Sequence, residues 1–207
     1  MKVKGNLNKK DLALKQIRDE VLVLTGSPLY AYRVKNKYLP VIGEGNHEAK
    51  IMFIGEAPGR NEAKTGRPFC GSAGKILDDL LASVGINRSD VYVTNIVKDR
   101  PQNNRDPLPE EIKIYGPFLD RQISIIQPQV IATLGRYSMR YIMEKFELIN
   151  VLRPISELHG RVFKTKSDYG KVSIIPLYHP AAAIYNQSLL TTLQQDFKIL
   201  SHPPARP

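Results

Sequence analysis

Hydrophobic and polar positions along the chain follow two patterns, and each pattern predicts one kind of element. Over residues 8–24 the apolar residues recur at helical spacing, which predicts an amphipathic helix. Continuous apolar runs bounded by glycine, proline or polar residues predict buried strands instead. Four such runs occur: AKIMFIG (49–55), DVYVTN (90–95), PQVIATLG (128–135) and KVSIIPLYHP (171–180).

Helical segments separate and follow these runs. Helices are predicted over residues 71–85, 109–127, 136–146 and 188–200. Within the second of them we expect Gly116 and Pro117 to disturb the helix, because proline lacks the N–H that continues it. The run RVFKTK (161–166) fits a short strand or one arm of a hairpin.

The alternation of strands and helices predicts an α/β protein. We expect a three-layer αβα fold with a central, mainly parallel four-stranded sheet. No repeat, linker or low-complexity block interrupts the pattern, so residues 1–207 are expected to form a single domain, with a frayed basic N-terminus and a frayed tail at residues 201–207.

Composition narrows the class of protein. The chain has 207 residues, 42% of them hydrophobic, and no apolar run long enough for a membrane span. The N-terminus lacks the apolar core of a signal peptide, so a cytoplasmic protein is expected. A single cysteine excludes an internal disulfide and a cluster held by the cysteines of one chain. The net charge of +10 fits a polyanionic partner such as nucleic acid, or a generally basic surface.

Polar residues follow several of the predicted strands. Glu56 follows the first, Asn95 ends the second, and His179 lies at the end of the last. Because ligands of parallel sheets bind outside the carboxyl ends of the strands, these residues are expected to face one crevice. Each also has a structural interpretation: Glu56 as a solvated loop acid, Asn95 as a turn cap, His179 as a surface histidine and Phe69 as a core residue.

Motifs around these residues resemble a known family. GEAPG (55–59), TGRPFCGSAGKILDDLL (65–81), VYVTNIVKDRPQNNRDPLPEEI (91–112), PFLDRQI (117–123), VIATLGR (130–136) and YHPAA (178–182) are similar to family 4 of the uracil-DNA glycosylase superfamily, the thermostable iron–sulfur type. The resemblance covers about residues 12–200. It implies a monofunctional hydrolase that flips uracil out of single- or double-stranded DNA and starts base-excision repair. We expect the protein to act as a monomer and not to bind a membrane.

The resemblance also implies roles for individual residues. Glu56 would position the attacking water, although the water-activating aspartate of some relatives corresponds here to Ala57. Phe69 would stack on the flipped base, Asn95 would bind the uracil edge, and His179 would donate to uracil O2 as charge develops. Gly55 and Ala57 belong to the same base-binding turn. Contacts with the DNA backbone would come from Gly59, Arg60, Lys64, Arg67, Arg100, Arg105, Gly135, Arg136 and Ala181, and Lys98 is expected at the same basic rim.

One part of the family pattern is missing. The four cysteines that hold a [4Fe–4S] cluster in the family correspond here to Leu24, Ser27, Asp99 and Tyr115. We therefore expect no cofactor and no metal. Two interpretations remain open: packing by Leu24 and Tyr115 replaces a structural cluster and activity survives, or uracil excision has been lost or redirected to another damaged base. The first is favoured because Glu56, Phe69, Asn95 and His179 are all present.

Two other classes of function are also open, a non-catalytic DNA-binding module and an N-glycosidase of free nucleosides. The intact set of pocket residues argues against the first, and the basic rim argues against the second. The lone cysteine, Cys70, is expected to pack beside Phe69 and not to act as a nucleophile.

Overall fold

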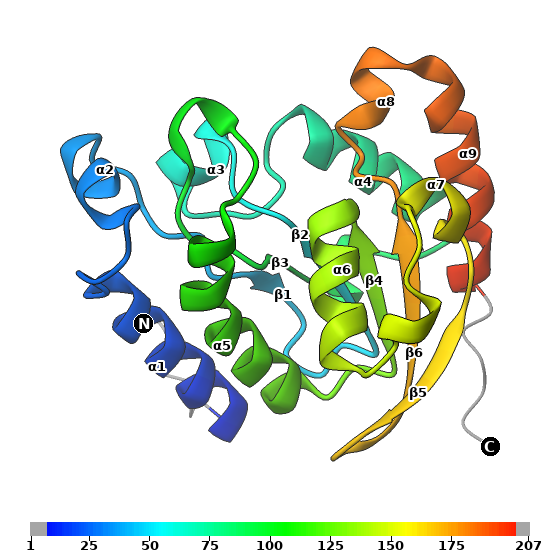
Figure 1. The fold of residues 1–207 in the computed structure, drawn as a ribbon, viewed down its shortest axis with the longest axis horizontal. Helices are drawn as coiled ribbons and strands as arrows, with labels where there is room; N and C mark the ends of the chain where they lie inside the picture. Colours follow the sequence, from blue (N-terminus) through cyan, green and yellow to red (C-terminus); the bar gives the residue numbers. More distant parts are fainter. Residues whose placement is uncertain (1–7, 202–207) are drawn as a thin grey trace, which may run out of the picture.

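The structure, a computed structural model, describes residues 8–201 and contains one mixed sheet with helices on both faces (Figure 1). The six strands are arranged in the order β1-β3-β2-β4-β6-β5. Their bounds are β1 Glu44–Gly45, β2 Ile51–Gly55, β3 Tyr92–Asn95, β4 Val130–Leu134, β5 Phe163–Ser167 and β6 Gly170–Leu177.

The four central strands are the four predicted from the apolar runs, and they pair in parallel. The sheet is wider than the predicted four strands because β1 and β5 add antiparallel edges. β1 has two residues and no apolar run, so its pattern carried no strand signal. β5 has alternating burial, as expected for an edge strand that buries only one face.

Two apolar layers hold the helices against the sheet. Met52 and Ile54 of β2 belong to one buried cluster, and Ile51 and Phe53 belong to the other. This alternation gives each face of the sheet its own core. On the first face pack α1 Lys9–Leu22, α5 Pro109–Ile126 and α6 Arg136–Lys145, and on the second face pack α4 Ser72–Ser83 and α9 Gln187–Phe197 (Figure 1).

Helix α5 is continuous, so the expected disturbance at Gly116 and Pro117 is wrong. Pro117 removes one intrahelical hydrogen bond without ending the helix. Gly116 has a packing role, because a Cβ on it would lie 2.5 Å from the Tyr141 hydroxyl of α6. The glycine therefore lets α6 approach α5 closely, and this tertiary contact outweighs the local helix-breaking tendency.

Short helices within predicted loops complete the fold. They are α2 Tyr30–Lys35, α3 Arg60–Thr65, α7 Ile155–Leu158 and α8 Ala182–Tyr185, with 3-10 turns at Arg88–Asp90, Gln102–Asn104, Ile149–Val151 and Lys198–Ser201. The N-terminal segment 1–7 and the residues 202–207 of the predicted tail lie outside the described residues. Among residues 8–201, no helix combines the length and apolar character that a membrane crossing needs.

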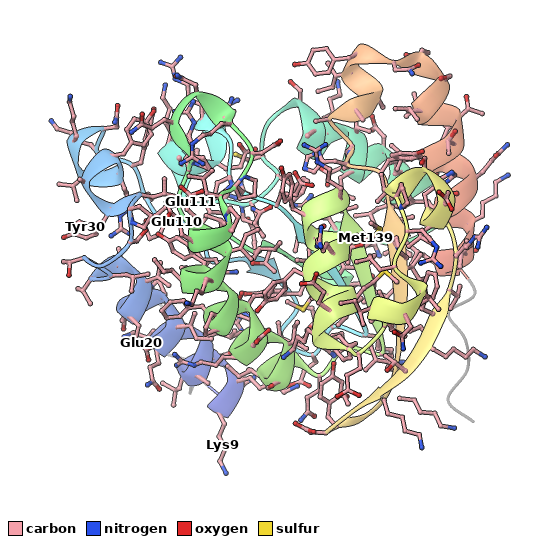
Figure 2. The ribbon with its side chains drawn as sticks, in the orientation of Figure 1. Lys9, Glu20, Tyr30, Glu110, Glu111 and Met139 are labelled. Atoms are coloured by element: carbon pink, nitrogen blue, oxygen red, sulfur yellow. The ribbon has the colours of Figure 1, made fainter. Side chains whose placement is uncertain are left out.

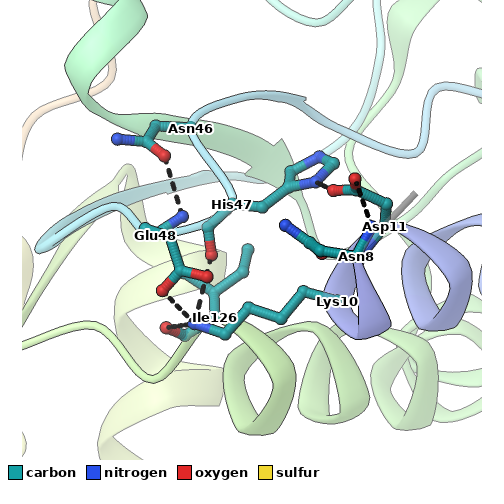
Figure 3. Close-up of polar contacts among 7 residues, drawn as sticks. All are labelled: Asn8, Lys10, Asp11, Asn46, His47, Glu48 and Ile126. Atoms are coloured by element: carbon teal, nitrogen blue, oxygen red, sulfur yellow. Dashed lines mark hydrogen bonds and ion pairs between the residues drawn. The ribbon is translucent and has the colours of Figure 1, made fainter. Parts of the chain in front are cut away.

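The start of α1 is bonded to segments near the amino ends of the parallel strands, opposite the site described below. The Lys10 Nζ donates to Glu48 Oε2 at 2.6 Å, and to the main-chain oxygens of His47 and Ile126 at 3.4 Å each (Figure 3). The His47 Nδ1 lies 2.5 Å from Asp11 Oδ1. One lysine therefore joins α1 to the end of α5 and to the segment that enters β2.

This junction predicts a difference between two neighbouring lysines. Lys10→Met should lower the free energy of unfolding by about 1 kcal/mol, because three acceptors lose a charged donor. The melting temperature should then fall by about 2–4 °C, measured by calorimetry. Lys9→Met is the matched control, since Figure 2 shows Lys9 pointing away from the fold. Equal melting temperatures for the two variants would contradict the role of Lys10.

Candidate active site

A cavity of ≈ 500 Å³ opens at the carboxyl ends of the parallel strands. This is the edge at which ligands of open α/β sheets bind. Nine of the residues singled out in the sequence line it: Glu56, Ala57, Gly59, Arg60, Phe69, Asn95, Arg105, His179 and Ala181. Six others do not belong to its lining: Gly55, Lys64, Arg67, Arg100, Gly135 and Arg136. Sequence reasoning missed several lining residues, among them Asn61, Glu62, Asn104 and Asp106.

Gly55 ends β2 and lets two side chains meet above it. A Cβ on Gly55 would overlap Asn95 Oδ1 and would lie 2.7 Å from Cζ of Phe69. Asn95 is paired with Gly55 at the last position of the parallel β2–β3 ladder. Only glycine leaves room for the asparagine amide and the phenyl ring to lie side by side at this position.

The Asn95 amide is buried, and its oxygen Oδ1 has no hydrogen-bond partner among the described residues. A buried polar atom without a partner costs about 1–3 kcal/mol. Such an atom at the wall of a cavity is available to a ligand that brings a donor.

Phe69 is held in the cavity by a strained loop. Its φ of 49° lies in the left-handed region, which is unusual for a bulky residue. The Glu62 carboxylate stabilises this loop, because its Oε1 accepts from the main-chain N–H groups of Cys70 at 3.0 Å and Gly71 at 2.9 Å. Glu62 is the third residue of α3, a helix that was not predicted because the surrounding sequence is rich in glycine.

His179 lies against the Phe69 ring, with 5.6 Å between ring centroids and 26° between the planes. That separation is less than twice the ~3.5 Å distance of stacked carbon atoms, so no third ring fits between them. The His179 Nδ1 accepts from the Ala181 N–H at 3.1 Å. Nδ1 therefore carries no proton, and Nε2 is the donor of the neutral ring. Burial lowers the pKa of His179 to about 4.

Glu56 is placed by the start of α6. Its Oε1 accepts from the Tyr137 N–H at 3.0 Å, within the first turn of that helix. Gly135 has a φ of 101°, and a Cβ there would overlap the Glu56 carboxylate. Gly135 thus makes space for the acid without lining the cavity. Burial is the main cause of a raised Glu56 pKa, and the negative charge of Asp106 adds to it.

The basic residues around the cavity differ in their availability. Arg60 and Lys64, both exposed on α3, have no hydrogen bond or ion pair within residues 8–201. Arg67 pairs with Glu44, Arg105 with Glu111, and Arg136 with Asp106. Arg100 donates to the hydroxyls of Tyr32 and Tyr38. Arg60 and Lys64 are therefore the predicted backbone-binding cations whose side chains have neither a hydrogen bond nor an ion pair within residues 8–201.

Two expectations about neighbouring residues are wrong. Lys98 was expected at the basic rim, but its side chain is fully buried behind Asn95. Ile96 and Val97, which precede it, are buried as well, so its charge gave a misleading surface signal. Cys70 does not pack beside Phe69; it is exposed, with Sγ 3.3 Å from Thr65 Oγ1.

The positions that correspond to cluster ligands do not fit an iron–sulfur cluster. Ser27, Asp99 and Tyr115 are bonded to one another: the Tyr115 hydroxyl lies 2.8 Å from Ser27 Oγ and 2.7 Å from Asp99 Oδ2. Arg33 Nη1 lies 3.3 Å from the other Asp99 oxygen. Leu24 packs against the adjoining core. The set offers no thiolate, and among residues 8–201 no group of three or more histidine, cysteine or acidic side chains could hold a metal.

Taken together, the cavity suits a planar polar ring. It combines an aromatic face, an unpartnered amide oxygen, an imidazole whose Nε2 can donate and a half-buried carboxylate, beside cations without an ion pair. Proteins that act on a base flipped out of a nucleic acid bring together the same kinds of groups.

Comparison with known proteins agrees with this class. The family model of the uracil DNA glycosylase superfamily matches residues 42–200, and the chain belongs to this superfamily. The type-4 uracil-DNA glycosylase of Sulfurisphaera tokodaii is 44% identical over 187 residues, which cover 90% of this chain and 82% of that protein. The type-4 enzyme of Archaeoglobus fulgidus is 46% identical over 167 residues, 81% of this chain and 82% of that protein.

A third relative has a different context. The DNA polymerase of Bacillus phage SP01 is 30% identical over 163 residues, which cover 78% of this chain but 16% of the polymerase. The same kind of sequence therefore also occurs within a much longer protein.

The hydrogen bond from Ala181 predicts the state of His179 in solution. Its ring should stay neutral, with the proton on Nε2, between pH 5 and pH 8, and should titrate with a pKa of about 4. Nitrogen-15 NMR of histidine-labelled protein measures both the tautomer and the pKa. A midpoint near the ordinary histidine value of about 6.5 would contradict an environment in which Nδ1 accepts from Ala181 and only Nε2 carries a proton.

Proposed function

We propose that this protein excises uracil from DNA by hydrolysing the N-glycosidic bond, the first step of base-excision repair. The observation that carries the proposal is the unpartnered Asn95 oxygen, buried beside Phe69 at the end of the sheet. We further propose that the protein acts as a monomer on both single- and double-stranded DNA, because its pocket needs only one extruded nucleotide.

Recognition of the base follows from the Asn95 amide. Its Oδ1 would accept from N3–H of uracil, while its NH₂ would donate to O4. Cytosine has an unprotonated N3 and an amino group in place of O4, so both contacts would become unfavourable. Phe69 would stack on one face of the base, a contribution of ~1–3 kcal/mol.

Departure of the base depends on His179. When the bond between C1′ and N1 breaks, its electron pair moves into the uracil ring and charge develops on O2. The neutral His179 would donate from Nε2 to this oxygen, because its Nδ1 is already occupied by the Ala181 N–H. One donor aimed at a developing oxyanion is worth about 2.7–4 kcal/mol.

Glu56 would act on the water that replaces the base. A water bonded to its carboxylate adds to C1′, and its proton passes to the carboxylate or to solvent. The raised pKa makes the ionised Glu56 a better proton acceptor than an ordinary carboxylate. Since no lysine belongs to the described lining of the cavity, we expect hydrolysis without a Schiff base and without strand cleavage.

We also propose that the protein works without an iron–sulfur cluster. The buried network of Ser27, Asp99, Tyr115 and Arg33 would join the segments that a cluster joins in type-4 relatives. Arg33 extends the network by donating to the main-chain oxygens of Val21 and Leu22 at the end of α1. Polar bonds would thus tie α1, α5 and the segment after β3 together.

Substitution of Asn95 tests recognition of the base. Asn95→Asp presents acceptors only, so it should lose selectivity for uracil and gain activity on cytosine. Single-turnover excision from matched uracil and cytosine oligonucleotides, followed by alkaline cleavage of abasic sites, measures the ratio. Asn150→Asp, exposed in the 3-10 turn Ile149–Val151, is the control. Full uracil selectivity in Asn95→Asp would contradict the assignment.

Substitution of His179 tests the leaving-group role separately. His179→Ala should lower the single-turnover rate on uracil by ~10²–10³ while leaving DNA affinity nearly unchanged, because its contact strengthens only as the bond breaks. His47→Ala, at the opposite edge of the sheet, is the control. A wild-type rate in His179→Ala would refute the role.

Salt dependence tests the two unpaired cations. If Arg60 and Lys64 bind phosphates, log affinity should fall linearly with log salt, and each alanine substitution should reduce the slope by about one unit. Fluorescence anisotropy with a labelled uracil oligonucleotide measures the slope. Lys166→Ala on the remote edge strand β5 should leave it unchanged. The same slope in all variants would exclude the proposed contacts.

Stability tests the network at the former cluster positions. Asp99→Ala leaves Arg33 buried without its carboxylate and should cost about 3 kcal/mol, a fall of about 6–12 °C in melting temperature. Asp78→Ala, which breaks an exposed pair with Arg88, should cost under about 1 kcal/mol. Iron chelators should leave the wild-type melting temperature unchanged. A chelator-sensitive transition, or equal effects of the two substitutions, would contradict the proposal.

A further inference from the structure

Lys98 lies directly behind the residue that the proposed function assigns to base recognition. Its Nζ donates to the main-chain oxygen of Asn95 at 2.6 Å, to Gln122 Oε1 at 2.6 Å and to Thr94 Oγ1 at 2.9 Å. The whole side chain is buried, and no carboxylate within residues 8–201 pairs with it.

The acceptors around Lys98 are themselves oriented. Gln122 Nε2 donates to the Ile42 oxygen at 2.9 Å and to the Tyr92 hydroxyl at 3.1 Å, so Oε1 faces the lysine. Thr94 Oγ1 donates to the same Ile42 oxygen at 2.6 Å, so it accepts from Lys98. The Ile42 oxygen is a fourth acceptor, 3.5 Å from Nζ, and burial lowers the pKa of Lys98 well below its usual value. Burying an amine is costly unless all its hydrogen bonds are made, so this fixed arrangement holds Nζ in one place.

The peptide between Asn95 and Ile96 is held from two sides, because its N–H donates to the Gly55 oxygen at 3.0 Å and its carbonyl oxygen accepts from Lys98. Gly55 and Asn95 are the last pair of the β2–β3 ladder, and no main-chain donor within residues 8–201 reaches the Asn95 oxygen. Lys98 Nζ supplies the donor that a further strand residue would have supplied. Within residues 8–201 the Asn95 side-chain oxygen has no hydrogen-bond partner, and it lies beside the Gly55 backbone and the Phe69 ring.

We infer that Lys98 is a positioning residue for uracil recognition, which acts by fixing the peptide of Asn95 and thereby the direction of its amide. The inference rests on the proposed uracil excision. Because a misplacement of about 1 Å at a reacting site can lower a rate by 10²-fold, loss of this bond should affect catalysis even where the fold survives.

A double-mutant cycle tests the inference. Lys98→Met keeps the length of the side chain but removes the amine, and should lower the single-turnover rate on uracil by ~10–100-fold. In an Asn95→Ala background the same substitution should change the rate by less than about twofold, because there is no amide left to position. In a His179→Ala background the full effect of Lys98→Met should remain. Lys113→Met, exposed on α5, is the control.

The outcomes separate the inference from the proposed function. An active wild type whose Lys98→Met effect is the same with and without Asn95 would overturn the positioning role and leave uracil excision intact. A wild-type rate in Lys98→Met would also overturn it. A wild type that releases no uracil would overturn both. If Lys98→Met does not fold, the cycle is run with Lys98→Met and Gln122→Leu together, since replacing both partners by apolar groups restores the packing.

Discussion

The parallel pairing of β2 with β3 and β4 is the constraint on which the site depends. It brings the carboxyl ends of these strands to one edge, and β6 extends the same parallel sheet beyond β4. At this edge Gly55 removes the one Cβ that would separate Asn95 from Phe69. Glu56 directly follows β2 and His179 is the second residue after β6, so the same geometry places the acid and the imidazole. Two helices fix the position of these groups by hydrogen bonds. The Tyr137 N–H at the start of α6 donates to Glu56, and Glu62 of α3 accepts from the loop that carries Phe69.

Much of this arrangement could be predicted from the sequence, because it is encoded locally. Four apolar runs indicate the four parallel strands, and the polar residues after three of them indicate the cavity. The same reasoning failed where tertiary contacts outweigh local signals. Pro117 lies inside the continuous helix α5, and Gly116 beside it packs closely against Tyr141. Lys98 is buried because three neutral acceptors surround its amine, and no pattern of charges along the chain reveals such an arrangement. Glu62 was not predicted to line the cavity, because the glycine-rich sequence around it gives no signal for the short helix α3 that carries it.

At the positions that correspond to the cluster cysteines of the family, a polar network connects separate segments of the chain. Leu24, Ser27, Asp99 and Tyr115 come from three separate segments, yet three of them share one hydrogen-bonded network that Arg33 completes. The sequence could show that the thiols were absent. It could not show that Arg33, which lies outside the family's ligand pattern, would form an ion pair with the buried Asp99 carboxylate. The segment after β3 is therefore held on both sides, by Asp99 in this network and by Lys98 behind Asn95.

Uracil release and iron content, measured on the same freshly purified sample, test the account most directly. The protein is incubated with a single-uracil oligonucleotide under single-turnover conditions, free uracil and abasic sites are counted, and bound iron is determined by elemental analysis. The account predicts one free uracil and one alkali-labile site per oligonucleotide from protein that contains no stoichiometric iron. Stoichiometric iron with an absorbance band near ~400 nm, or iron-free protein that releases no uracil, would contradict it.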